Sequence, residues 1–399
     1  MLTYTAPKAT VQQVLKTHPL QVEQACCGQV KKVLARLSRC RTSQIGFHLY
    51  RCTPEQCAHL PYQYHSCRDR HCPQCGAVKK QQWIEARTRE LLPVKYYHVV
   101  FTLPHELNSL VLAHQRLLHK LLLDASWQTL LAFARDAKYL GARPGILSVL
   151  HTWGQQLSFH PHVHCIVSGG AITGEGQWKE AKKNDWRFLF PLKAMAVVYR
   201  AKFLQGLKAL LAERQITPAE GGDVNALFNL LYQKQWVVYT KAPFGGPQPV
   251  IEYLGSSTHK VAISNHRLVS IDAQEDTVTF HYKDYADDGK QKLMTLSAQE
   301  FIRRFSQHIL PKGFTKIRMY GYLANTDRQG HINEVVRHLQ LPQHPVALSV
   351  PFALRLLEHY GVQVNRCPCC GASSMELVLV YLPCKRADDG CVSSKVDTR

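Results

Sequence analysis

The sequence predicts an α+β protein whose main sheet is antiparallel and ferredoxin-like, preceded by a small, metal-stapled helical and irregular domain. Segments rich in β-branched and aromatic residues alternate with amphipathic helices in the order strand, helices, strand, strand, helix, strand, which is typical of the ferredoxin-like unit. Upstream, cysteines and histidines crowd residues 40–76 with little periodicity, which indicates a metal-held module. The four strands are expected at 96–103, 146–153, 162–169 and 235–240, and the helices between them across 105–139 and at 192–215.

The N-terminal module is expected to hold a zinc ion. Helices with basic faces are predicted within residues 10–40, and a further helix at 79–92 ends before Pro93. Between them lie Cys52-x4-Cys57 and the knuckle Cys72-x2-Cys75, and two such pairs make a closed tetrahedral zinc site. We therefore predict one zinc ion on these four cysteines. The spare candidates for replacing one ligand or serving a second ion are Cys67, Cys40, His48 and His71.

Three parts of the chain follow from this reading. They are a zinc-binding, DNA-binding domain at 1–92, the sheet domain at 93–325, and a C-terminal extension at 326–399. Within the second part, two more strands are expected at 260–264 and 277–283, and a helix at 297–310. In the extension, Cys367-x2-Cys370 has no clear mate, although Cys384 and Cys391 are candidates for completing a second metal knuckle.

The charge balance favours a polyanionic partner. The chain has 49 Lys and Arg against 29 Asp and Glu, a formal net charge of +20. Nucleic acid is the first candidate, and a merely basic or ribosome-associated protein is the alternative. Apolar runs such as 109–123 are interrupted by charged residues, and the N-terminus lacks the order of a signal peptide. We expect no membrane association and a cytoplasmic, nucleoid-associated protein, in which the 14 cysteines serve as metal ligands or buried thiols.

Histidines at alternate positions on the third strand indicate a second metal site. His162 and His164, in FHPHVHCIVSGG, would share one face of the strand, because alternate side chains point the same way. Two neutral imidazoles can hold a divalent ion and leave positions open for phosphate oxygens. Because the chain has 21 histidines, one such pair is expected by chance, so its weight depends on the surrounding sequence.

That surrounding sequence resembles a known family. The motif HPHVHC is similar to the H-hydrophobic-H motif of the HUH endonucleases. The wider chain resembles the rolling-circle, two-tyrosine transposases of the IS-ninety-one-like insertion sequences. The resemblance is carried, in the family's order, by SCRDRHCPQC, YYHVVFTLPHELN, HTWGQQLSFHPHVHCIVSGG, EYLGSSTHKVAISNHRL and IRMYGYLAN (317–325).

The resemblance implies an enzyme that cleaves and rejoins single-stranded DNA at insertion-sequence ends. A tyrosine attacks a phosphodiester, a 5′-phosphotyrosine link forms, and the 3′-hydroxyl leaves. On this chain it assigns the nucleophile to Tyr253 and the metal ligands to His162 and His164, with Mg²⁺ or Mn²⁺ preferred over zinc. Host replication or helicase proteins would be further partners.

The chain departs from the family pattern at the second tyrosine. In Y-x3-Y the second position is Ser257 here, so a mechanism that alternates two tyrosines is in doubt. The third metal ligand is also open. Its candidates are His160, His151, Gln156 and His259. Of these, His160 is preferred because it would lie on the same strand face as His162 and His164. His98 and His105, near the first strand, are interpreted as structural or surface residues.

Basic residues in two segments are predicted to contact DNA phosphates, and for the segment that holds Arg303 and Arg304 the alternative is core aromatics with solvated arginines. They are Arg68, Arg70, Lys79, Lys80, Arg303 and Arg304. The rival functions are a non-catalytic DNA-binding relic of a transposase, a replication initiator or relaxase, and a zinc-finger regulator. The last leaves His162, His164 and Tyr253 without a role.

Overall fold

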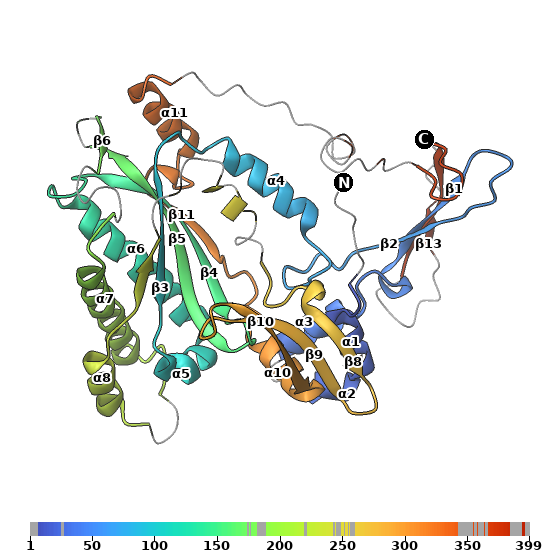
Figure 1. The fold of residues 1–399 in the computed structure, drawn as a ribbon, viewed down its shortest axis with the longest axis horizontal. Helices are drawn as coiled ribbons and strands as arrows, with labels where there is room; N and C mark the ends of the chain where they lie inside the picture. The colour runs from blue at the N-terminus through green and yellow to red at the C-terminus, as the bar shows by residue number, and fades with distance from the viewer. Residues whose placement is uncertain are drawn as a thin grey trace.

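The structure is a computed structural model that contains three sheets and the helices that pack on them (Figure 1). It describes residues 7–24, 28–173, 175, 177–181, 189–218, 222–241, 244, 249–250, 252–253, 255, 260–341, 354, 357, 363, 366–383 and 393–395. Short 3₁₀ turns join some of the elements at Ser43–Ile45, His105–Leu107, Asn265–Arg267 and Gly321–Leu323. No described helix has the length and apolar character needed to cross a membrane.

The central sheet has the predicted ferredoxin-like order. Its strands are β3 (Tyr96–Thr102), β4 (Arg143–Trp153), β5 (Phe159–Ile172), β7 (Val238–Thr240) and β11 (Ile317–Tyr320). They lie in the order β11-β4-β5-β3-β7 with every pairing antiparallel, and β6 (Trp178–Glu180) pairs with β5. The order β4-β5-β3-β7 is that of the ferredoxin-like unit, and β11 adds a strand at its edge. The predicted α+β class and antiparallel sheet are confirmed.

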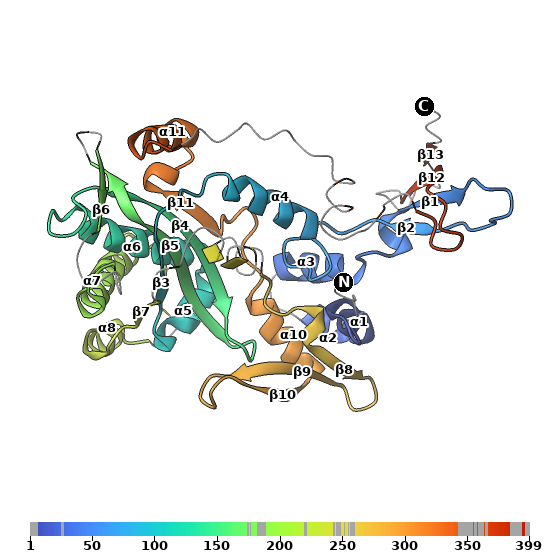
Figure 2. The same cartoon turned by 45° about the horizontal axis from the view of Figure 1, so that its top comes forward.

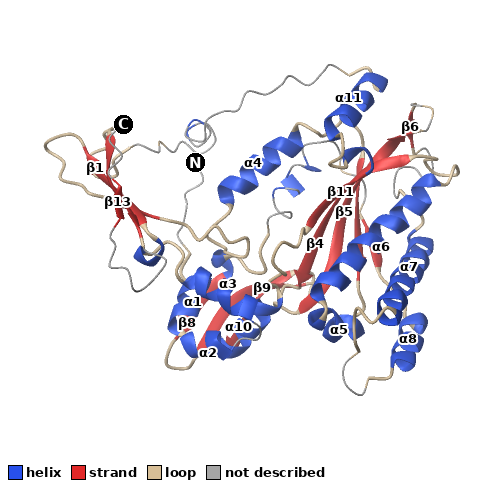
Figure 3. Cartoon of the chain, turned by 180° about the vertical axis from the view of Figure 1, so that it is seen from behind, coloured by secondary structure: helices blue, strands red, loops and turns tan. Residues whose placement is uncertain are grey.

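Helices cover one face of this sheet and create its main core (Figure 3). They are α5 (Asn108–Ala113), α6 (Gln115–Arg135), α7 (Leu192–Ala212) and α8 (Val224–Gln233). Alternate residues of the strands, including Phe101 and Val163, point to this face and pack against Tyr199 and Phe203 of α7. Each such fully buried apolar side chain contributes about 1.5–3 kcal/mol through the hydrophobic effect.

The opposite face is covered over part of its length. α4 (Ala77–Thr88) and α11 (Arg328–His338) lie on this side (Figure 1), and Val149 and Ile166 pack there with Val335 of α11. Gly145 permits this packing, because the ring of Tyr322 lies 2.5 Å from where a Cβ would be. The histidines of β5 lie on this same face.

A second core joins the two halves of the sequence. α1 (Val11–Thr17), α2 (Pro19–Gln24) and α3 (Gly28–Ser38) pack against β8 (Leu268–Asp272), β9 (Thr277–Asp284), β10 (Lys290–Ser297) and α10 (Ala298–Gln307), as Figure 2 shows. Leu34, Phe280 and Phe301 are buried in this core. The helix predicted at 297–310 and the strand predicted at 277–283 are present. Residues 260–264 form no strand, since Ala262 and Ile263 are buried by loop packing alone.

A third, peripheral sheet pairs the N-terminal and C-terminal regions. β1 (Phe47–Cys52), β2 (Tyr62–Tyr64), β12 (Met375–Leu382) and β13 (Ser393–Lys395) lie in the order β13-β12-β1-β2. In Figures 1 and 2 this sheet lies at the end of the molecule opposite α7 and α8. Packing therefore connects segments on both sides of residues 92 and 325, and the predicted domain boundaries stay predictions.

Candidate active site

Three histidines from two neighbouring strands meet on the partly covered face of the central sheet. In the register of β4 with β5, His151 lies opposite His162, and Val149 lies opposite His164. A side-chain nitrogen of each of His151, His162 and His164 lies within 4.8 Å of the others. The structure thus brings the predicted pair together and adds a histidine from the adjacent strand.

The preferred third ligand, His160, is not part of this group. His151 lies directly across from His162, and the register of β4 and β5 shifts only beyond this pair, so that Trp153 lies across from Phe159. His160 contributes its backbone instead, since its carbonyl accepts a hydrogen bond of 2.6 Å from Nδ1 of His162. Of the other candidates, Gln156 lies outside the group and His259 lies outside the described residues.

The environment keeps the cluster in the state that binds metals. Burial lowers the pKa of His162 to about 4. Burial also lowers the pKa of His164, with further contributions from His151, His162, His98 and Lys260. Both imidazoles are therefore neutral at neutral pH, as metal ligation requires. Because Nδ1 of His162 donates to a carbonyl, its Nε2 carries the free lone pair, which is the usual outer-shell arrangement of a ligand histidine.

Tyr253 lies beside these histidines. It is half-buried in a helical turn, and its hydroxyl lies 2.9 Å from Nε2 of His98. Its ring centroid is 6.1 Å from that of His164 and 5.8 Å from that of Phe244. The candidate nucleophile and the histidine cluster, which are far apart in sequence, are thus in one site. Ser257, the position of the second family tyrosine, lies outside the described residues.

His98, interpreted from the sequence as a structural or surface residue, also lies in this site. It is buried on β3, and its Nε2 also lies 2.9 Å from Nδ1 of His164. Burial, Lys241 and His162 lower the pKa of His98 to about 4, so it too is neutral. Its sequence signal is its place in the strand that pairs with the H-x-H strand. His105, by contrast, is exposed.

Cationic groups lie near the cluster. Lys260 disfavours the charged forms of His162 and His164, which indicates its electrostatic proximity. Together with Arg70 and Lys316 it lines a cavity, and burial lowers the pKa of Lys316 to about 8. The positive charge suits a phosphate-bearing ligand. Arg70, predicted to bind DNA, donates hydrogen bonds to the carbonyls of Phe314 and Pro311.

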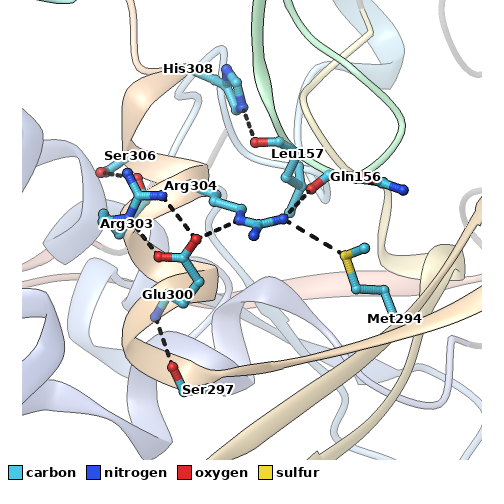
Figure 4. Close-up of polar contacts among 9 residues, drawn as sticks. All are labelled: Gln156, Leu157, Met294, Ser297, Glu300, Arg303, Arg304, Ser306 and His308. Atoms are coloured by element: carbon cyan, nitrogen blue, oxygen red, sulfur yellow. Dashed lines mark hydrogen bonds and ion pairs between the residues drawn. The ribbon is translucent and has the colours of Figure 1, made fainter. Parts of the chain in front are cut away.

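Arg303 and Arg304, also predicted to contact DNA, are held by protein groups on α10. Both bind the carboxylate of Glu300 at 2.6 Å (Figure 4). Arg304 also donates to the backbone carbonyl of Gln156 at 3.0 Å, which fastens the turn between β4 and β5 to α10. Arg304 therefore has a structural role, and DNA contact by either residue stays a prediction.

The other predicted DNA contacts lie on the zinc knuckle and on α4. Arg68 and Lys79 are exposed and Lys80 is half-buried. These three also stay predictions.

The predicted single zinc set is wrong, because the cysteines form two separate clusters. Cys72 and Cys75 lie with Cys40 and Cys67, and in each cluster the four sulfurs lie within 4.8 Å of one another. The second cluster is Cys52, Cys57, Cys367 and Cys370. β1, with six residues rising about 3.3 Å each, leads away from Cys40 and carries Cys52 at its far end. Cys52 and Cys72 thus cannot share an ion.

In the first cluster Sγ of Cys75 lies 3.3 Å from that of Cys40 and 3.6 Å from that of Cys67. His71, a spare ligand candidate, instead accepts a hydrogen bond from the Leu310 amide at Nε2. Cys384 and Cys391 lie outside the described residues.

Comparisons with known proteins agree with this architecture. Residues 11–103 match a family model described as "Transposase zinc-binding domain", and residues 145–330 match one described as "Putative transposase". The chain is 37% identical over 371 residues to "Putative transposase y4qJ" of Sinorhizobium fredii, covering 88% of this chain and 89% of that protein. It is 29% identical over 357 residues to "Transposase for insertion sequence element IS801" of Pseudomonas savastanoi pv. phaseolicola, covering 86% and 82%.

The match to residues 11–103 contains the first cysteine cluster, and the match to residues 145–330 contains His151, His162 and His164. The identity to whole-length relatives extends across both and into the C-terminal region. The chain therefore belongs to the IS-ninety-one-like family of insertion-sequence transposases and carries that family's zinc-binding domain.

Proposed function

We propose that this transposase cleaves and rejoins single-stranded DNA at insertion-sequence ends through a covalent link to Tyr253. The observation that carries the proposal is the 2.9 Å contact between the Tyr253 hydroxyl and His98, next to the histidine cluster. The tyrosine hydroxyl gives up its proton and its oxygen forms a bond to phosphorus, the bond from phosphorus to the 3′ oxygen breaks, and the departing oxygen takes up a proton. Rejoining reverses these bonds.

His98 orients the nucleophile in this proposal. Its neutral Nε2 has one lone pair, which accepts the hydrogen bond of the Tyr253 hydroxyl. Tyrosine has a pKa near 10 in water and is a weak nucleophile, so positioning and electrostatic help must supply much of the rate. Lys260, whose charge acts on His162 and His164, adds positive charge close to the place where the phosphate would bind.

The histidine cluster fits a divalent ion, with His151, His162 and His164 as its ligands. A metal bound there would polarise the phosphate oxygens. Three neutral imidazoles make a nitrogen-only donor set, which suits Mn²⁺ better than the strictly oxygen-seeking Mg²⁺. Of the two ions expected from the sequence, we therefore favour Mn²⁺.

The zinc ion of the N-terminal domain is assigned to Cys40, Cys67, Cys72 and Cys75. Four thiolates form a closed tetrahedral shell with no position for substrate, so the ion is structural. It would hold the turn that carries Arg68. This exposed residue lies between the ligands Cys67 and Cys72 in the sequence. Arg68 and Lys79 are then available for DNA phosphates. Host replication or helicase proteins stay a prediction.

The test is the formation of a protein–DNA adduct. Purified protein, Mn²⁺ and a labelled single strand carrying the element's terminus would be resolved on a denaturing gel, with Tyr253→Phe and His162→Ala beside the wild type. Tyr285→Phe is the matched control, because Tyr285 is 74% exposed in the turn that follows β9. We expect an adduct in the wild type and in the control, and none in the two site variants.

An adduct that survives Tyr253→Phe would move the nucleophile elsewhere. Binding of the strand without any adduct would favour a non-catalytic relic, the alternative that Ser257 in place of the second tyrosine keeps open.

A further inference from the structure

The second cysteine cluster draws its members from both ends of the chain. Cys52 ends β1, Cys57 follows it, and Cys367 and Cys370 precede β12. We propose that these four thiolates bind a second zinc ion, which fastens the C-terminal segment to the N-terminal part of the chain. The family match to a zinc-binding domain covers residues 11–103, so it includes only half of these ligands.

The sulfur positions fit a tetrahedral ion. Thiolates about 2.3 Å from zinc lie about 3.8 Å from one another in a tetrahedron. Sγ of Cys57 lies 3.8 Å from that of Cys367, and Sγ of Cys52 lies 3.4 Å from that of Cys370. A disulfide requires a sulfur separation near 2.0 Å, so neither pair is bonded. All four sulfurs lie within 4.8 Å of one another, as ligation of one ion requires.

The backbone on both sides is shaped for the ion. Gly371 has φ +76°, a left-handed conformation that favours glycine, and its N–H donates to the carbonyl of Cys367 at 2.9 Å. The backbone N–H groups of Cys370 and Cys369 are directed at Sγ of Cys367. Opposite, the N–H of Cys57 donates to the carbonyl of Pro54 at 2.9 Å. Tight turns that aim amides at sulfur favour the deprotonated state that ligates zinc.

The peripheral sheet also needs such an ion for its stability. Its buried cluster consists of Cys52, Cys57 and Cys367, with only Ala372 and Met375 packed against them among the described residues. β2 is exposed at every position, and β12 is half-buried at best. A sheet with so little apolar burial is not stable by the hydrophobic effect alone, and small domains of this kind commonly rely on a structural metal.

The proposed ion lies where the two chain segments first meet. Cys52 is paired with Met375 at the end of the β1–β12 ladder, and the N–H of Thr53 donates to the carbonyl of Ser374 at 3.3 Å. The site would therefore close the ladder at one end and fix its register. This role is independent of the DNA chemistry proposed above, because no residue of the histidine site takes part.

The first test compares two neighbouring cysteines in the unaltered full-length protein. Cys369 and Cys370 are both exposed, but only Cys370 belongs to the cluster. Native protein would be alkylated with iodoacetamide, and each cysteine would be quantified by mass spectrometry with and without a zinc chelator. We expect Cys369 to react readily, and Cys370 to react at least about tenfold more slowly until the chelator is added. Equal rates before chelation would overturn the proposal.

The second test counts metal. Elemental analysis of the full-length protein is compared with that of Cys367→Ser/Cys370→Ser and of the control Cys369→Ser. We expect one zinc ion fewer in the double variant than in the wild type, and no change in the control. A double variant that is folded and retains all of the wild-type zinc would contradict the site. Because the alkylation experiment needs no substitution, misfolding of the double variant would not leave the proposal undecided.

Discussion

Nε2 of His98 lies 2.9 Å from the hydroxyl oxygen of Tyr253, and the same nitrogen lies 2.9 Å from Nδ1 of His164. An imidazole nitrogen has either one lone pair or one proton, so it engages these two partners in turn. His98 therefore couples the proposed nucleophile to a proposed metal ligand.

The substitution His98→Gln is expected to slow adduct formation by about 100-fold at saturating Mn²⁺, because misplacing a reacting group by about 1 Å has an effect of that order. His105→Gln is the control, since His105 is exposed and lies just beyond the same strand. The rate would be measured by quenching single-turnover reactions over time. A rate unchanged by His98→Gln would show that Tyr253 needs no partner for its orientation.

Removal of His151 is expected to weaken Mn²⁺ binding far more than removal of His160. His151 contributes a nitrogen to the group, whereas His160 contributes a backbone carbonyl that Ala would retain. Loss of an outer-shell partner typically weakens metal binding roughly 10–100-fold, and loss of a ligand should exceed that. Titration of the free Mn²⁺ signal by electron paramagnetic resonance would compare His151→Ala with His160→Ala. Equal affinities in the two variants would contradict the assignment of His151.

The free energy of unfolding is expected to decrease when the pH is lowered below about 6.5, and His119 is one cause. Its side chain is buried in α6, neither ring nitrogen has a hydrogen-bond partner among the described residues, and burial lowers its pKa to about 3. An unfolded histidine has a pKa near 6.5, so between these values the unfolded state binds more protons. The free energy of unfolding therefore decreases as the pH falls.

For His119 alone the decrease is about 2 kcal/mol between pH 7 and pH 5. His119→Leu should remove that share of the pH dependence, as urea unfolding at the two pH values would show. His105→Gln should leave the pH dependence unchanged. An equally steep decline in His119→Leu would mean that other groups govern the acid sensitivity.

Two adjacent arginines of α10 are expected to differ in their effect on stability. Arg304→Ala removes the hydrogen bond to the Gln156 carbonyl and should lower the free energy of unfolding by about 1–2 kcal/mol. Arg303→Ala removes an exposed ion pair with Glu300, for which about 0.5 kcal/mol is typical. Thermal unfolding would measure both. A larger loss in Arg303→Ala would refute the structural role given to Arg304.

Much of the central sheet could be predicted because its strands are marked by composition and bounded by clear turns. Alternation along one strand also places His162 and His164 on one face. The sequence could offer His151 only as one of four candidates for the third ligand, and it did not point to His98, because both placements depend on the register between strands. Nor could it bring Tyr253 to His98, which is 155 residues away.

The cysteines illustrate the same limit. The spacing identified Cys52 with Cys57, Cys72 with Cys75 and Cys367 with Cys370 as ligand pairs, but any two pairs could bind one ion. The path of β1 is what separates Cys52 from Cys72. The mates of Cys52 and Cys57 lie more than 300 residues downstream, with separations of 318 and 310 residues for the closest sulfur pairs.

The pairing of early with late segments has a consequence for synthesis on the ribosome. β1 is made early, yet its partner β12 begins at Met375. The helices α1–α3 likewise pack against strands and a helix of residues 268–307, which are synthesised much later. The nascent chain must therefore carry an unpaired strand edge and uncovered apolar helix faces through most of its translation, and such surfaces promote aggregation. A chain released before residue 268 would lack both partners, and one released between residues 308 and 374 would still lack β12, so the peripheral sheet can form only late in translation.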